Sequence, residues 1–185
     1  MDSLKQYVKY TYLSATVVAN SVTAQNNYIV ISRGNAQSVK EGMAVIDINN
    51  GVIGITSEAT SGFTAVMSLL HKDSKISGKL LKSGETGTIS WDGKMPNIVS
   101  FTGISKGAKV TKGDTIITSG FSTSFPKGLV IGYVEEAIPE KNTSNYSIKL
   151  RTAANFYNLQ YVFVINNKQQ NEINELLDKV KKQSN

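Results

Sequence analysis

The sequence contains no cysteine and only one histidine among its 185 residues. Without cysteine the chain can form neither disulfides nor the thiolate nucleophiles and zinc sites that cysteine supplies. It also has no run of about 18 apolar residues and no segment with the features of a signal peptide. A membrane anchor, if the protein has one, is therefore expected outside this sequence.

The scarcity of histidine argues against catalysis as well. A Ser-His-Asp site needs a base beside the nucleophile and an acid that orients the base. His71 has Asp73 close in sequence and is expected at the end of a strand, turning outward, but Ser119 and Ser122 lie in neither a Gly-Asp-Ser-Gly nor a Gly-x-Ser-x-Gly setting. One histidine and scattered acidic residues also give no metal-ligand spacing. We expect no enzymatic activity, no metal and no cofactor, with a protease-like barrel as an alternative.

Acidic residues are outnumbered by basic ones, which gives a formal net charge of +6. A basic protein can meet nucleic acid, an anionic membrane surface or an acidic polymer. The charge is spread thinly, however, and the only dense run is Lys179, Lys181 and Lys182 near the C-terminus. Small barrels that bind single-stranded nucleic acid combine basic and aromatic residues along one surface, and no strand here interleaves them. We expect no nucleic-acid partner and keep a nucleic-acid-binding barrel as the other alternative.

What the sequence does contain is a succession of short, β-branched apolar runs separated by glycine and asparagine. Asn49-Asn50-Gly51 is a strong hairpin signal, and strict alternation places Phe63, Ala65, Met67 and Leu69 on one face of a strand. Many short strands favour an all-β fold of barrels or sandwiches, and closed barrels leave no unpaired edges. Strands are predicted over Ala15–Val22, Tyr28–Ser32, Met43–Asp47, Val52–Thr56, Phe63–Leu69, Lys75–Leu81, Gly87–Trp91, Asn97–Thr102, Asp114–Thr118, Leu129–Ala137, Tyr146–Arg151 and Tyr161–Ile165.

One sequence pattern occurs twice in the chain. Gly42, a short apolar run, a turn and the run ending at Gly54 correspond to Gly113, an apolar run, a longer loop and the run ending at Gly132. The two copies are 71 residues apart at their first glycine (113 − 42) and 78 apart at their last (132 − 54), so the added length lies in the loop. This repeat predicts two similar small β-barrels in tandem, each of about six strands.

The second copy also carries recognisable motifs. Gly113–Gly120 reads G-D-x-(I/V)-x-T-S-G and Phe125–Gly132 reads F-P-K-G-L-x-(I/V)-G, with further matches at Val39–Met43 and Ser83–Ser90. Together these blocks resemble the extracytoplasmic part of the rod shape-determining MreC family over roughly residues 15–165. The motif residues that carry the resemblance and that we expect to shape the backbone are Gly42, Gly113, Asp114, Ser119, Gly120, Lys127, Gly128 and Gly132.

The resemblance implies a function and a location. It implies a non-enzymatic scaffold of the bacterial cell-elongation machinery, on the extracytoplasmic (periplasmic) face of the inner membrane and anchored by an N-terminal segment outside this sequence. The implied partners are penicillin-binding proteins, other membrane components of that machinery, and further copies of the chain in a dimer or filament.

The ends of the chain are expected to be helical. Residues 1–13 are predicted to be the end of a helix or coiled coil with an apolar edge that includes Leu4 and Val8, or else a frayed terminus. Residues 14–82 and 83–166 are assigned to the first and second barrels, divided at the polar, glycine-containing break after Leu81. Residues 167–185 are predicted to form an amphipathic helix with its apolar stripe at Ile173, Leu176, Leu177 and Val180.

The long loop of the second copy is the expected partner-binding site. It carries two phenylalanines, Phe121 and Phe125, among glycine, serine and Pro126. Phe125 is expected to be packed, because proline restricts the preceding residue to extended geometry. Phe121 is expected to be the exposed anchor, with a plug in the end of the barrel as the alternative. Gly128 is expected either to have φ > 0 or to lie against neighbouring backbone. Leu4 and Val8 are the corresponding candidates for self-association.

Overall fold

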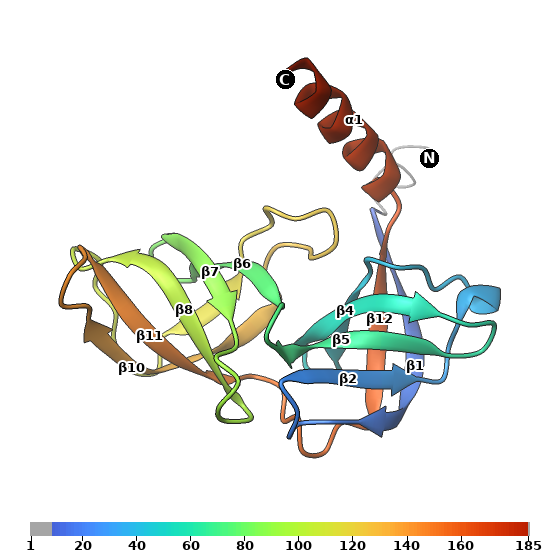
Figure 1. Cartoon of the computed structure of the whole chain (residues 1–185), viewed down its shortest axis with the longest axis horizontal. Helices are drawn as coiled ribbons and strands as arrows, with labels where there is room; N and C mark the ends of the chain where they lie inside the picture. Colours follow the sequence, from blue (N-terminus) through green and yellow to red (C-terminus); the bar gives the residue numbers. More distant parts are fainter. Residues whose placement is uncertain (1–8, 185) are drawn as a thin grey trace, which may run out of the picture.

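A computed structural model describes residues 9–184 and contains two closed, six-stranded antiparallel barrels followed by a C-terminal helix (Figure 1). The predicted fold, two tandem small barrels with a C-terminal helix, is therefore confirmed. Within residues 9–184, no helix is long and apolar enough to cross a membrane.

The first barrel takes strands from both ends of the chain. In order around the barrel these are β1 (Tyr10–Asn20), β12 (Tyr161–Asn167), β3 (Ala44–Asp47), β4 (Val52–Ala59), β5 (Thr64–His71) and β2 (Asn26–Ile31), which pairs back with β1. A short 3₁₀ helix, Asn35–Gln37, lies in the connection from β2 to β3. The interior is filled by branched aliphatic side chains such as Ile29, Ile31, Val66 and Val164, all fully buried.

The second barrel has the same architecture. In order it contains β10 (Val130–Pro139), β11 (Asn145–Thr152), β8 (Ile98–Ser105), β7 (Thr86–Ser90), β6 (Lys75–Leu80) and β9 (Thr115–Thr118), which pairs back with β10. Read from β3, the first barrel runs β3-β4-β5-β2-β1-β12, and read from β9 the second runs β9-β10-β11-β8-β7-β6. Each strand of one barrel thus has a counterpart in the other, as the sequence repeat predicted.

The strand correspondence corrects the predicted domain boundary. The strand at residues 75–80 was assigned to the first barrel and the strand at 161–165 to the second, whereas the structure has them the other way round. In the first barrel β12, from the far end of the chain, lies between β1 and β3. Its counterpart in the second barrel is β6, which lies between β7 and β9. Only residues 72–74 separate β5 from β6, and the polar break after Leu81 is merely the turn from β6 to β7.

The N-terminal prediction is also corrected where the structure describes it. Residues 10–13 were predicted to be helical but begin β1, which pairs with β12 from Tyr10↔Asn167 to Thr16↔Tyr161. An edge of β12 needs a partner strand, and this long-range pairing overrides the weak local helical pattern. Leu4 and Val8 lie outside the described residues. The C-terminal helix is confirmed as α1 (Gln170–Gln183).

The repeated glycines have equivalent backbone roles. Gly42 and Gly113 have φ of 81° and 90°, a left-handed conformation that suits the tight turn before β3 and β9. A Cβ atom on Gly54 or Gly132 would lie 2.1 or 2.3 Å from a carbonyl oxygen of the next strand. Both pairs of glycines are therefore required by the barrel backbone, which explains why they recur at matching positions.

Candidate partner-binding site

The long loop between β9 and β10 leaves the second barrel through a hydrogen-bonded neck. The buried Thr118 hydroxyl donates to the Pro126 carbonyl at 2.5 Å and accepts the Leu129 N–H at 2.9 Å, which ties the two sides of the loop together. On the entry side, the Ser119 hydroxyl bonds Ser77 of β6 at 2.7 Å and accepts the Phe121 N–H at 3.1 Å. The loop is thus anchored to the barrel at its base.

Two glycines give the neck its shape. Gly120 has φ 86°, and a Cβ atom there would lie 2.9 Å from Cβ of Lys127 on the opposite side of the neck. Gly128 has φ 94°, as expected, and its N–H donates to the Thr118 carbonyl at 3.1 Å. The motif residues Ser119, Gly120, Lys127 and Gly128 therefore lie together at the base of the loop.

Phe125 fastens the loop against the first barrel. Its side chain is 6% exposed and borders a small hollow of about 140 Å³ with Ile55 of β4 and Met67 of β5. The Ser122 hydroxyl accepts the N–H groups of Ser124 and Phe125 at 3.0 and 3.1 Å and so holds the local turn. The expectation that Phe125 and Pro126 pack is confirmed, since both are buried. The ring lies between the barrels and not in the end of one.

The same loop also bonds to the chain leading into α1. The Asn167 side-chain amide donates to the Thr123 carbonyl at 2.9 Å. The Gln170 amide donates to the Ser124 hydroxyl at 3.1 Å and to the Gly42 carbonyl at 2.8 Å. Figure 1 shows the loop reaching from the second barrel toward the base of α1. Gln170 thus joins the loop of one barrel to the turn before β3 in the other, a role that no motif in the sequence indicated.

Phe121, by contrast, lies in the open. Its side chain is 77% exposed, which confirms that it is the freer of the two phenylalanines. It lines a hollow of about 520 Å³ with Ile173 and Leu177 on the near part of α1. Leu176 and Val180 extend the exposed apolar stripe along the helix, and α1 has no buried residue. We call Phe121, Ile173, Leu176, Leu177 and Val180 the Phe121–α1 surface.

Asp114, the acidic residue of the motif, has a structural role at the other end of β9. Its carboxylate accepts the Thr111 N–H at 2.7 Å and pairs with Lys82 at 2.6 Å. Burial alone would raise the pKa of Asp114, but the hydrogen bonds from Lys82 and Thr111 and the charge of Lys82 together hold it below its usual range. The carboxylate closes the turn before β9 and links it to the turn after β6.

The residues considered for hydrolysis are not brought together. His71 ends β5 as predicted, but it is buried at 4% exposure, with its ring edge against Tyr28 at a centroid distance of 5.1 Å, and does not turn outward. Its Nδ1 accepts the Asp73 N–H at 3.0 Å. Among the described residues no hydrogen bond joins the His71 ring to a serine hydroxyl, and the Ser119 hydroxyl is bonded at the neck of the loop.

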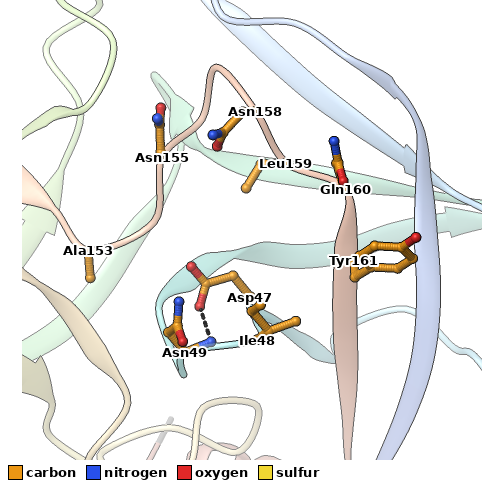
Figure 2. A pocket seen from close by; sticks show the side chains of 9 residues that line it. All are labelled: Asp47, Ile48, Asn49, Ala153, Asn155, Asn158, Leu159, Gln160 and Tyr161. Atoms are coloured by element: carbon orange, nitrogen blue, oxygen red, sulfur yellow. Dashed lines mark hydrogen bonds between the residues drawn. The ribbon is translucent and has the colours of Figure 1, made fainter.

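A further hollow, of about 380 Å³, lies where the chain returns from the second barrel to the first, beside the turn from β3 to β4. Figure 2 shows its amide-rich lining, with Asn155, Asn158 and Gln160 on one side and Asp47 and Asn49 on the other. The Asp47 carboxylate is occupied in the turn, where one oxygen accepts the N–H groups of Asn49 and Gly51 at 2.8 Å each. This hollow pairs no nucleophile with a base.

Residues 17–166 match the family model described as rod shape-determining protein MreC, barrel core. The chain is 32% identical over 176 residues to the cell shape-determining protein MreC of Bacillus subtilis, covering 90% of this chain and 60% of that protein. The chain thus spans less than two thirds of the length of that relative.

Solved structures resemble the fold. The major periplasmic domain from the cell shape-determining filament MreC superposes with a TM-score of 0.71 at 18% identity, covering 86% of this chain and 97% of that one. A complex between penicillin-binding protein 2 and MreC from Helicobacter pylori contains a chain that superposes with a TM-score of 0.66 at 18% identity, covering 86% of this chain and 99% of that one. At these identities the likeness establishes the shared fold.

Proposed function

The chain belongs to the MreC family of rod shape-determining proteins, which are not enzymes, and from this premise we propose that it is a scaffold of the cell-elongation machinery. In this role it lies on the extracytoplasmic side of the inner membrane and organises peptidoglycan synthases there. The related periplasmic domain supports the compartment. The proposed membrane anchor is an N-terminal segment outside this sequence. Membership of this family favours the scaffold over the two alternatives, a protease-like barrel and a nucleic-acid-binding barrel.

The observation that carries the proposal is the contrast between the two phenylalanines of one loop. Phe125 is buried between the barrels, whereas Phe121 is 77% exposed on a loop that both barrels hold in place. An exposed aromatic side chain on a fixed loop loses little conformational freedom on binding, which is typical of an interface anchor. We assign Phe121, with Phe125 and Pro126 as its support, to the binding of a partner.

The proposed partner is a penicillin-binding protein of the elongation machinery. The Helicobacter pylori relative was solved in a complex with penicillin-binding protein 2, which supports a partner of this class. A scaffold that holds such enzymes beside one another raises their effective local concentration without any chemistry of its own. Other membrane components of the machinery are proposed to be collected in the same way.

Self-association is the second part of the proposal. The exposed stripe of α1 is an apolar surface that a second copy could cover, and the apolar residues Leu4 and Val8 are the proposed contacts from the N-terminal segment. The relative described as a filament supports assembly of copies into a dimer or a filament.

The first test is a pull-down from membrane extract with the chain as bait, with captured penicillin-binding proteins labelled by a fluorescent penicillin. Wild type is expected to capture labelled protein and Phe121→Ala to capture much less. Tyr157→Ala is the matched control, because Tyr157 is another exposed aromatic residue, at 65%, outside the loop. Equal capture by wild type and Phe121→Ala would refute the assignment of Phe121, and no capture by any variant would refute this class of partner.

A further inference from the structure

Three lysines meet beside Phe121. Lys9 precedes β1 of the first barrel, Lys79 lies on β6 of the second, and Lys127 lies in the neck of the loop. Together with Tyr10 and Phe121 they line a hollow of about 370 Å³. The cluster therefore combines residues of both barrels, and Lys127 belongs to the loop that Figure 1 shows reaching toward α1.

No carboxylate among the described residues neutralises this cluster. The ion pairs in residues 9–184 join Lys82 to Asp114 and join Lys112 and Arg151 to Glu135, and none includes Lys9, Lys79 or Lys127. The nearby turn after β6 carries Glu85, whose carboxylate accepts a hydrogen bond from the Ser83 hydroxyl. The three positive charges thus face solvent together.

Lys127 also perturbs Lys79. Side-chain contact with Lys127, partial desolvation and the positive charge of Lys127 all lower the pKa of Lys79. Lys9 is close enough to Tyr10 for a cation–π contact, with Nζ 5.4 Å from the ring centroid. A bound anion would offset the repulsion between Lys79 and Lys127, because opposite charge within a few ångströms favours the protonated amines.

The cluster shares a wall with the apolar hollow on α1. Lys9, Gly120 and Phe121 line both hollows, so the positive groups and the apolar side chains of Ile173 and Leu177 are adjacent across Phe121. A free phosphate or a lipid headgroup would use only the charged half of this surface. A peptide segment with acidic residues beside an apolar side chain would use both halves at once.

We propose that Lys9, Lys79 and Lys127 receive the carboxylates of an acidic segment of a partner protein, whose apolar side chain packs between Phe121 and the first turns of α1. This inference rests on the proposed function, because it names the chemistry of the partner that binds at Phe121. It assigns the specificity of the site to charge complementarity, which steers association and rejects basic partners.

The test is selection from a displayed library of random twelve-residue peptides, followed by binding measurements on charge-reversed chains. The site variant is K79E with K127E, and the control is K141E with K149E, which changes net charge by the same amount. Lys149 lies on β11, opposite β6 in the same barrel, and Lys141 follows β10. K79Q with K127Q replaces the site variant if reversal lowers the melting temperature.

Selected peptides are expected to be acidic, with at least one aromatic or leucine residue. Their affinity should fall at least tenfold in the site variant and in Phe121→Ala, and less than twofold in the control. Neutral or basic peptides, no selected peptides, or equal losses in site and control variants would overturn the inference. Binding of inorganic phosphate or phosphatidylglycerol vesicles that depends on the lysines but not on Phe121 would overturn it in favour of an anionic polymer or lipid.

The same variants separate this inference from the proposed function. If capture of a penicillin-binding protein is lost in Phe121→Ala but unchanged in the site variant, the scaffold proposal stands and the charge assignment fails. If acidic peptides bind as expected but no penicillin-binding protein is captured, the charge assignment stands and the proposed partner class fails.

Discussion

Truncation of the two loop phenylalanines, one at a time, should separate stability from binding. Phe125→Ala removes a ring that is buried, at 6% exposure, and that lines a hollow together with Ile55 and Met67 of the other barrel. Truncating a buried phenylalanine typically costs about 3–5 kcal/mol, from lost transfer free energy and the cavity left behind. Because the ring borders a hollow of about 140 Å³, it already lacks some packing partners. We therefore expect Phe125→Ala to lose about 3 kcal/mol of folding free energy, the low end of this range.

Phe121→Ala is the matched control within the same loop. Its ring is 77% exposed, so truncation should cost less than about 1 kcal/mol of folding free energy. For a chain of this size each kcal/mol shifts the melting temperature by about 2–4 °C. The expected shifts are about 6–12 °C for Phe125→Ala and less than about 4 °C for Phe121→Ala.

Thermal and urea unfolding should be followed for both variants by far-ultraviolet circular dichroism and by the fluorescence of Trp91. Trp91 is 5% exposed and immediately follows β7, so it reports on the second barrel. If Phe125→Ala melts within about 2 °C of wild type, or if both variants lose the same stability, Phe125 does not wedge the loop between the barrels and the reasoning is refuted.

The remaining predictions concern the turns and ends of the chain. Gly128→Val should destabilise the protein by about 1–3 kcal/mol, because valine at the φ of 94° found there is strained, and an unchanged melting temperature would contradict this. Asp114→Asn should lower stability by about 1 kcal/mol at pH 7, as measured by urea unfolding. The pKa of Asp114 is lower in the folded than in the unfolded state, so the carboxylate stabilises the fold above the unfolded-state pKa, and this stabilisation is lost as the pH falls through the folded-state pKa. The difference in unfolding free energy between wild type and Asp114→Asn should therefore vanish in acid. A difference that stays constant with pH would show that the charge of Asp114 is not involved. Gln170→Ala should cost about 1 kcal/mol by removing hydrogen bonds to Ser124 and Gly42. Truncation of Gln169, whose side chain forms no hydrogen bond to another residue in the range 9–184, should not have this cost. Deletion of residues 1–8 should weaken any dimer measured by sedimentation, and a dimer of unchanged affinity would show that Leu4 and Val8 are not its interface.

The repeat was the most informative signal in the sequence, because its glycines are fixed by local backbone geometry. Gly42 and Gly113 need φ > 0, and Gly54 and Gly132 permit close approach of the next strand. Such requirements can be recognised from neighbouring residues alone. The strands that close each barrel could not be recognised in this way, because β12 and β6 occupy equivalent places in the two barrels although they lie at unrelated positions along the chain.

Alternation on β5 shows why the contact between the barrels was missed. The predicted apolar face includes Ala65 and Met67, which are half-buried, yet Val66 and Ser68 on the opposite face are fully buried. Met67 lines the hollow beside Phe125, outside its own barrel. A strand covered on both faces gives an alternation that does not reveal which face lies inside. The exposure of Phe121 could be predicted, but its position beside α1 depends on packing that no local pattern encodes.

The central claim is that Phe121 binds a penicillin-binding protein. Its most direct test is calorimetric titration of the extracytoplasmic domain of penicillin-binding protein 2 into wild type and into Phe121→Ala. Loss of about 1–2 kcal/mol of binding free energy corresponds to a Kd raised about 5–30-fold. The account predicts a rise of this size with a melting temperature within about 4 °C of wild type. An unchanged Kd in the folded variant would contradict it.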